Sequence, residues 1–183
     1  MKKILFFALM ACLICSCKKD VTETVKKASA YMEVTHELAV DECNYVSHIW
    51  HKTIQDDVVN VRKDGYGIYD LVSHFNDTNC VRCYNFNEAL GVYYKSERRA
   101  KSMEQIALAM DSCKTQIQLL KDHKSSQDKL CEQVKLTYRA LQDVVDCAEN
   151  PKGSLVNYVQ DVNTKSDAFQ SSNREILNML EFE

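Results

Sequence analysis

Residues 103–148 read MEQIALAMDSCKTQIQLLKDHKSSQDKLCEQVKLTYRALQDVVDCA, and this stretch decides the fold. Apolar side chains recur in it at alternating steps of three and four residues, before and after a polar break at residues 123–126. Such spacing places them along one face of a helix. The two series are Met103, Ile106, Met110, Cys113, Ile117 and Leu120, then Cys131, Val134, Tyr138, Leu141, Val145 and Ala148. The stretch therefore predicts two amphipathic helices.

A connection as short as this one makes two helices antiparallel neighbours. Folding the chain at residue 122 brings four pairs of apolar residues to the same level. The pairs are Cys113 with Cys131, Met110 with Val134, Ile106 with Tyr138, and Met103 with Leu141. Because one register satisfies all four layers, we expect a helical hairpin with coiled-coil-like packing.

The whole chain has a helical character. It contains one proline and four glycines in 183 residues, and both residue types interrupt helices. Further apolar stripes predict a first helix over residues 21–62, a short helix over 86–94 and a last helix over 155–180. We therefore predict an all-α fold, an up-down antiparallel bundle of four main helices plus a short extra helix. We also predict an irregular, cysteine-containing connection at residues 64–84 and no strand of useful length.

The N-terminus has the features of an export signal. Met1-Lys2-Lys3 precedes an apolar run from Ile4 to Cys15, and Ser16-Cys17-Lys18 follows. A basic start, about a dozen apolar residues and a small residue before a cut are typical of a secretory signal peptide. The run is shorter than the roughly 20 apolar residues that span a bilayer.

Cleavage of this predicted signal peptide would fall before a cysteine. Residues 14–17, Ile-Cys-Ser-Cys, resemble the lipobox of bacterial lipoproteins, in which that cysteine is acylated and becomes the new N-terminus. A second candidate lipobox, Leu9-Met10-Ala11-Cys12, would leave only a very short apolar run. We therefore expect lipidation at Cys17.

The resemblance to lipoproteins implies a domain plan and a location. Residues 1–16 are the signal peptide, 17–30 are a tether and the start of the first helix, and 31–183 form a single helical-bundle domain. Cys17 would carry a diacylglyceryl thioether and an N-acyl chain such as palmitate, and two or three acyl chains hold a protein firmly on a membrane. We expect a lipid-anchored protein of the cell envelope, in the outer membrane if the host is Gram-negative.

Charge and motifs exclude several function classes. Without the signal peptide the chain carries 21 basic and 26 acidic residues, a formal charge of −5, and no basic stripe that would bind nucleic acid. The sequence has no glycine-rich phosphate loop, no nucleophile elbow and no HExxH motif. We therefore expect no catalytic residue, no nucleic-acid partner and no cofactor other than the covalent lipid on Cys17.

Six cysteines remain in the exported part of the chain beyond Cys17. They are Cys43, Cys80, Cys83, Cys113, Cys131 and Cys147. An even number in an exported protein predicts a disulfide framework. The hairpin register favours a bridge between Cys113 and Cys131. We expect Cys147 to pair with Cys80 or Cys83, and Cys43 to take the remaining one.

Two motifs allow other functions. Cys80 and Cys83 have CxxC spacing, which suits thiol–disulfide exchange, but they fall in a predicted loop between helices without a βαβ context. His48 and His51 lie one helical turn apart and could share a metal or haem, although zinc needs more ligands than these two. For Cys80 and Cys83 we favour a role as structural cysteines. For His48 and His51 we favour a solvated helix face.

Three segments together resemble an uncharacterised family of exported helical bacterial proteins. They are residues 48–54 (HIWHKTI), 86–90 (FNEAL) and 150–155 (NPKGSL). The resemblance covers roughly residues 40–170, supports the order of the helices, and implies no activity or ligand. We therefore expect a lipid-anchored, non-catalytic envelope protein that acts through contacts with an envelope or extracellular protein. The alternatives are a thiol–disulfide factor using Cys80 and Cys83, or a metal- or haem-binding bundle using His48 and His51.

Overall fold

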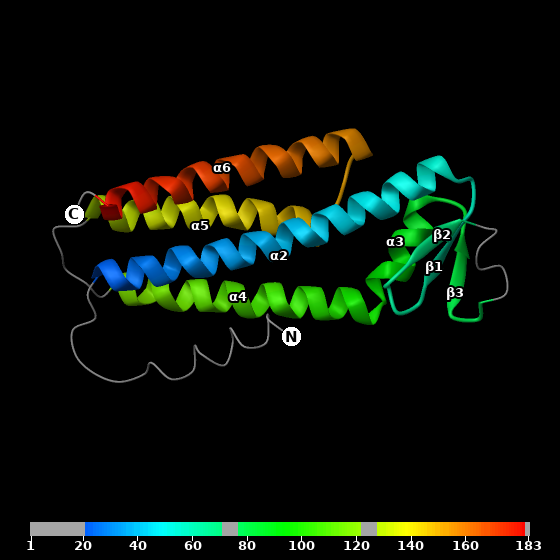
Figure 1. Ribbon diagram of the computed structural model, residues 1–183, viewed down its shortest axis with the longest axis horizontal. Helices are drawn as coiled ribbons and strands as arrows, with labels where there is room; N and C mark the ends of the chain where they lie inside the picture. The colour runs from blue at the N-terminus through cyan, green and yellow to red at the C-terminus, as the bar shows by residue number, and fades with distance from the viewer. Residues whose placement is uncertain (1–20, 71–76, 122–127, 182–183) are drawn as a thin grey trace.

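The structure is a computed structural model that describes residues 21–70, 77–121 and 128–181 (Figure 1). Its elements, in chain order, are α2 (Val21–Gln55), β1 (Val59–Arg62), β2 (Ile68–Asp70), β3 (Cys80–Cys83), α3 (Phe86–Tyr94), α4 (Glu97–Lys121), α5 (Asp128–Glu149) and α6 (Leu155–Glu181). The prediction of a mostly helical fold is confirmed. The prediction that the chain forms no strand is wrong.

The elements form two parts. Figure 1 shows the long helices α2, α4, α5 and α6 lying alongside one another, and we call this part the helical body. The three strands and α3 lie together at the end of the body that is remote from Val21, and we call this part the head. Among the described helices, none is both long and apolar enough to cross a membrane.

The first predicted helix is too long, because its last residues are strand β1. Val58, Val59 and Val61 are β-branched and favour extended backbone. Val59 and Val61 are both buried, which strand geometry permits because residues two apart share a face. The steps between Ile54, Val58 and Val61 fit a helical stripe, but the valines that the structure buries are Val59 and Val61 of β1.

The sheet has the order β2-β1-β3 with antiparallel pairing throughout. A tight turn joins β1 to β2 and contains Gly65, whose φ is +81°. A Cβ at this position would meet Ser96 Oγ at 2.2 Å, so the turn needs glycine both for its backbone and for its space. The carbonyl of Gly65 accepts a hydrogen bond from the Tyr45 hydroxyl at 2.6 Å, which ties the sheet to α2.

The helix α2 is the centre of the helical body. It packs against α4, α5 and α6, whereas α4 and α5 approach each other through few residues. The predicted hairpin partners are therefore not the main neighbours, and the side chain of Cys113 lies against Thr35 of α2. The apolar stripe of α4 was interpreted correctly as a buried face, but that face mainly covers α2.

Polar residues on the buried faces of α2 and α6 pair across the interface. The Ser29 hydroxyl donates to Asn173 Oδ1 at 2.7 Å, and Asn173 Nδ2 donates to Glu33 at 2.9 Å. His36 lies 2.7 Å from Ser166 Oγ, and its ring stacks on that of Phe169 with centroids 4.5 Å apart. Each polar interruption of these stripes is therefore satisfied by a specific partner, as buried polar groups require.

Candidate functional site

An open groove of about 570 Å³ lies in the head between strand β3 and helix α3. Its lining residues are Lys63, Val81, Arg82, Cys83, Glu88, Gly91, Val92 and Lys95. Three of them, Glu88, Gly91 and Val92, belong to α3, and Lys95 is its C-cap. These four residues stand at i, i+3, i+4 and i+7, so they lie on one face of that helix. The groove is therefore built from the edge strand of the sheet and one face of the short helix.

The start of α3 is fixed by a capping box. The side chain of Asn85 accepts a hydrogen bond from the backbone N–H of Glu88 at 3.0 Å. In return, the Glu88 carboxylate accepts from the Tyr84 backbone N–H and from Asn85 Nδ2, both at 2.8 Å. These bonds satisfy donors that the first turn of a helix leaves open. The acidic group of the groove is thus already engaged in holding the helix.

Gly91 lies inside α3 and faces the groove. A glycine inside a helix costs roughly 1 kcal/mol relative to alanine. An added Cβ at Gly91 would meet nothing within 4 Å, so no contact within the described chain requires a glycine there. The absence of a side chain at this position keeps the groove open.

Cations surround the groove and apolar side chains form part of its lining. Lys63, Arg82 and Lys95 supply three positive charges, and Val81, Cys83 and Val92 supply apolar surface. The Lys63 ammonium group donates to the Thr78 carbonyl at 2.8 Å. The groove therefore suits a ligand that presents carboxylates next to apolar groups.

Exposed aromatic side chains gather in the same part of the molecule. Among the large hydrophobic residues that the described chain exposes, the aromatic ones are Tyr66, Tyr84 and Tyr94, with 56%, 62% and 40% of their surface exposed. All three lie in the head or in its turns, while the exposed residues of the helical body are aliphatic. Tyrosine is enriched in protein–protein interfaces, so the head has the composition of a binding surface.

A buried ion pair between α2 and α4 contacts the head through Tyr93 of α3. The Glu42 carboxylate of α2 is fully buried and lies 2.7 Å from a guanidinium nitrogen of Arg99 in α4. Arg99 also donates to the Ala148 carbonyl at 2.8 Å, and the Tyr93 hydroxyl donates to Glu42 Oε1 at 2.7 Å. Burial, and then the hydrogen bond to Glu42, holds the pKa of Tyr93 far above its ordinary value, so the hydroxyl keeps its proton.

The sequence analysis missed this ion pair. Glu42 stands next to Cys43 on the apolar side of α2, and an acid there is a sign of a buried partner. The partners Tyr93 and Arg99 lie 51 and 57 residues away along the chain, so no local pattern connects them. The Tyr93 hydroxyl, which donates to Glu42, ties the head to this pair, and all three side chains are buried.

A second groove, of about 420 Å³, lies between α4 and α5. It also contains cations, but two of them are paired with neighbouring carboxylates on their own helices. Lys114 lies 3.2 Å from Asp111, and Lys135 pairs with Glu132. The positive charge of this groove is therefore partly neutralised by the neighbouring carboxylates.

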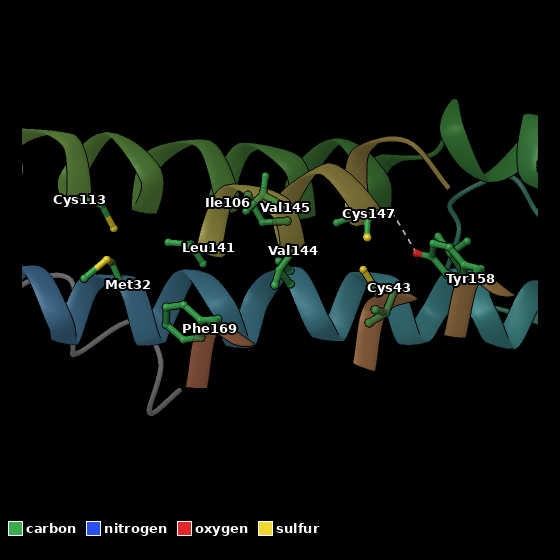
Figure 2. Close-up of a cluster of buried hydrophobic side chains, with 14 of the residues drawn as sticks. Met32, Cys43, Ile106, Cys113, Leu141, Val144, Val145, Cys147, Tyr158 and Phe169 are labelled. Atoms are coloured by element: carbon green, nitrogen blue, oxygen red, sulfur yellow. Dashed lines mark hydrogen bonds between the residues drawn. The ribbon is translucent and has the colours of Figure 1, made fainter. Parts of the chain in front are cut away.

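All six described cysteines are free thiols in the structure. The predicted bridge between Cys113 and Cys131 is not present, because the Cys113 sulfur points toward α2 and lies 3.5 Å from Thr35 Oγ1 (Figure 2). Burial raises the pKa of the Cys113 thiol to about 11. The few contacts between α4 and α5 explain why the sequence register did not bring these two sulfurs together.

Cys80 and Cys83 lie on strand β3 and not in a loop, which corrects the prediction for this pair. Residues three apart on a strand point to opposite faces, and their Cα atoms are about 10 Å apart. A disulfide needs Cα atoms closer than about 7 Å, so the two cannot bridge without breaking the strand. Burial also raises the pKa of Cys80 and raises that of Cys83 to about 11, so neither is an activated thiol.

Cys147 lies opposite Cys43 of α2 in the helical body, as Figure 2 shows. The expected pairing of Cys147 with Cys80 or Cys83 therefore does not match the structure. The physical reason is the position of α5, which packs on α2 and α6 and makes no substantial contact with the strands.

His48 and His51 lie on the exposed side of α2, together with Asn44 and Gln55. Burial first, and then the positive charge of Lys52, lowers the pKa of His48. Within the described part of the chain, no three residues of the types His, Cys, Asp and Glu stand close enough together to hold a metal ion. The structure therefore brings no further ligand to the two histidines.

The remaining predicted site, Cys17, lies outside the described residues, as do Cys12 and the whole segment predicted to be a signal peptide. Comparison of the chain with protein-family models, with curated proteins and with solved structures finds no match. The function must therefore be argued from the geometry of the head and of the body.

Proposed function

We propose that this chain is a lipid-anchored, non-catalytic protein of the cell envelope whose helical body holds the head away from the membrane. The head would bind a partner protein through the groove between β3 and α3. The observation that carries the proposal is this groove, with its three cations, its apolar lining and the glycine that the fold itself does not need.

The position of the head supports this arrangement. Helix α2 has 35 residues and is therefore about 52 Å long. The head lies at the end of α2 remote from Val21, while Cys17 stands four residues before Val21 in the sequence (Figure 1). A lipid on Cys17 would thus attach one end of the molecule to the membrane, and the groove would face the space about 50 Å away. In this proposal the four long helices act as a stiff up-down antiparallel rod.

The partner is expected to be an exported or envelope protein that presents acidic and apolar side chains together. Lys63, Arg82 and Lys95 would attract its carboxylates, and Val81 and Val92 would contact its apolar groups. Charge pairing of this kind mainly raises the association rate and selects the partner. The exposed tyrosines of the head would extend the contact area.

Neither alternative function gains support from the described residues. A thiol–disulfide factor needs an activated pair, and Cys80 and Cys83 are separated by the strand and have raised pKa values. A metal or haem site at His48 and His51 would need ligands that the neighbouring part of α2 does not provide. Binding through the head groove remains the function that the geometry supports best.

Photo-crosslinking tests the binding function. A photoreactive amino acid replaces Lys95 at the groove, and in a matched variant it replaces Lys135, an exposed lysine of α5. The proposal predicts a discrete adduct from position 95 in intact cells, which is lost when Arg82→Glu reverses one charge of the groove. Equal adducts from both positions, unaffected by Arg82→Glu, would contradict it.

Membrane fractionation tests the anchor separately. The Cys17→Ser variant should move from the membrane fraction to the soluble fraction, because acylation needs the thiol, while Cys12→Ser should stay with the membrane. Retention of the Cys17→Ser protein in the membrane would contradict the lipid anchor, and it would leave the groove to be judged by crosslinking.

A further inference from the structure

Cys43 of α2 and Cys147 of α5 lie at the same level of the helical body. Figure 2 shows their sulfur atoms pointing toward each other across the space between the two helices. Both residues are buried, with 0% and 4% of their surface exposed. Tyr158 of α6 closes the site, and its hydroxyl donates to the carbonyl oxygen of Cys147 at 3.1 Å.

The contrast with Cys113 shows that burial alone does not create such a pair. Cys113 is equally buried, but its sulfur is directed at the hydroxyl of Thr35 at 3.5 Å. Figure 2 shows Met32 of α2 opposite it, and methionine cannot form a disulfide. Cys43 and Cys147 instead face each other from two different helices.

We propose that Cys43 and Cys147 form a disulfide bond that links α2 to α5. The pair differs from every pairing that sequence spacing suggested, since the two residues are brought together only by the packing of the body. The proposal stands apart from the binding function of the head, and either can fail without the other.

The surroundings of Cys147 indicate which of the two sulfurs reacts first. Lys165 Nζ lies 3.3 Å from Cys147 Sγ, and Asp161 Oδ2 lies 3.4 Å from the same sulfur. Burial raises the pKa of both thiols, that of Cys43 to about 12. At Cys147 the ammonium group of Lys165 offsets part of this effect, more than the carboxylate of Asp161 adds to it, and Cys147 is also the less deeply buried of the two. Cys147 is therefore the sulfur that reacts first.

The reaction is an exchange with an external disulfide, either a small one such as oxidised glutathione or that of an envelope thiol oxidase. The Cys147 thiolate attacks one sulfur of the oxidant, and the other sulfur leaves as a thiolate that takes up the proton that Cys147 released. Cys43 then loses its proton and attacks Cys147 Sγ, which expels the second sulfur of the oxidant as a thiol. Two protein thiols become one disulfide, and the oxidant disulfide becomes two thiols.

Peptide mapping tests the proposal, because trypsin places each of the six cysteines in a different peptide. Cys43 falls in residues 28–52 and Cys147 in residues 140–152. The full chain, purified in detergent with reduced thiols, is treated with oxidised glutathione under native conditions, alkylated and digested without reduction. We expect the linked peptide 28–52/140–152 as the main cross-linked product, and two fewer thiols per chain. The same oxidation in denaturant provides the reference, since six cysteines can then pair in many ways.

Single variants complete the test. Cys43→Ser and Cys147→Ser should each abolish the linked peptide, while Cys113→Ser, a control at an equally buried cysteine, should leave it intact. The bridge closes a loop of about 100 residues, so the oxidised chain should melt higher than the reduced chain by on the order of 10 °C. A native digest with no 28–52/140–152 peptide, or with the same mixture of pairings as in denaturant, would overturn the proposal.

Discussion

The helical body and the head are stabilised in different ways. The body consists of helices of 22 to 35 residues that bury long stripes against the shared helix α2. The head consists of strands of three or four residues and a nine-residue helix, which are too short to be stable alone. The head therefore depends on the body, through the hydrogen bond from Tyr93 to Glu42 and through the turn at Gly65.

This difference indicates which part is free to carry function. Long helices with a continuous core form a stiff support whose surface tolerates change. The head keeps features that do not serve its own stability, namely the glycine inside α3, the cations of the groove and the exposed tyrosines. Features that a fold retains at a cost to its stability are expected at functional sites.

Among the tests of this difference between head and body, removal of the ion pair of Glu42 and Arg99 should have the largest effect. Glu42→Ala would leave the Arg99 guanidinium buried without its counter-charge, and breaking such a pair costs about 3–5 kcal/mol. We expect a loss of this size in the free energy of unfolding, measured with urea. Glu37→Ala, at an exposed acid one turn earlier in the same helix, should change stability by less than about 0.5 kcal/mol. Equal effects would show that the junction does not hold the head.

Two glycines with positive φ offer a matched pair. Gly65 in the head and Gly153 before α6 have φ of +81° and +93°. A Cβ at Gly65 would also collide with Ser96, whereas a Cβ at Gly153 would meet only Asn157 Cβ, at 3.9 Å. We expect Gly65→Ala to cost more than Gly153→Ala, about 2–3 kcal/mol against about 1 kcal/mol, in thermal or urea unfolding. A larger cost at Gly153 would contradict this account of the turn.

The N-cap of α3 tests whether the head can be destabilised without the body. Asn85→Ala removes the acceptor for the Glu88 backbone N–H and should destabilise the helix by about 1 kcal/mol. Hydrogen exchange should therefore accelerate in residues 86–94 and remain unchanged in α6. Uniform acceleration over the whole chain would show that the head and the body unfold as one unit.

The smallest expected effect is a pH dependence located in the body. Burial lowers the pKa of His36 below its ordinary value of 6.5, so the unfolded chain binds this proton more readily than the folded one. The stability contributed by the neutral ring is complete above pH 6.5 and is lost as the pH falls below that value. A His36→Gln variant should show a weaker fall in unfolding free energy between about pH 7 and pH 5 than the original chain. An unchanged slope would assign the acid sensitivity to other groups.

The body was largely predictable from sequence because its signals are local. Apolar steps of three and four place Ile106, Cys113 and Leu141 on buried faces, and the structure buries all three. The identity of the neighbouring helix was not predictable, because a stripe shows which face is buried and not what covers it. The packing of α4 on α2 follows from the wide buried face of α2, which only the assembled body reveals.

The strands of the head were not predictable from the sequence, because they are short. Val58 and Val61 also fit a helical spacing, and a strand of three residues such as β2 leaves almost no alternation to detect. The short helix predicted over residues 86–94 is confirmed, and it begins with the capping box of Asn85 and Glu88. The groove was not predictable, since Lys63, Arg82 and Lys95 meet only when β1, β3 and α3 have assembled.

The most direct test of the central claim compares two substitutions at Gly91. Gly91→Ala adds one methyl group in open space and should stabilise the chain by up to about 1 kcal/mol, whereas Gly91→Leu should fill the groove while leaving the fold intact. The measurement is the yield of the photo-crosslink from position 95 in each variant, with circular dichroism as the control for folding. The account predicts a yield close to the original for alanine and a nearly complete loss for leucine. An undiminished crosslink in the folded leucine variant would contradict the claim that the head groove is the binding site.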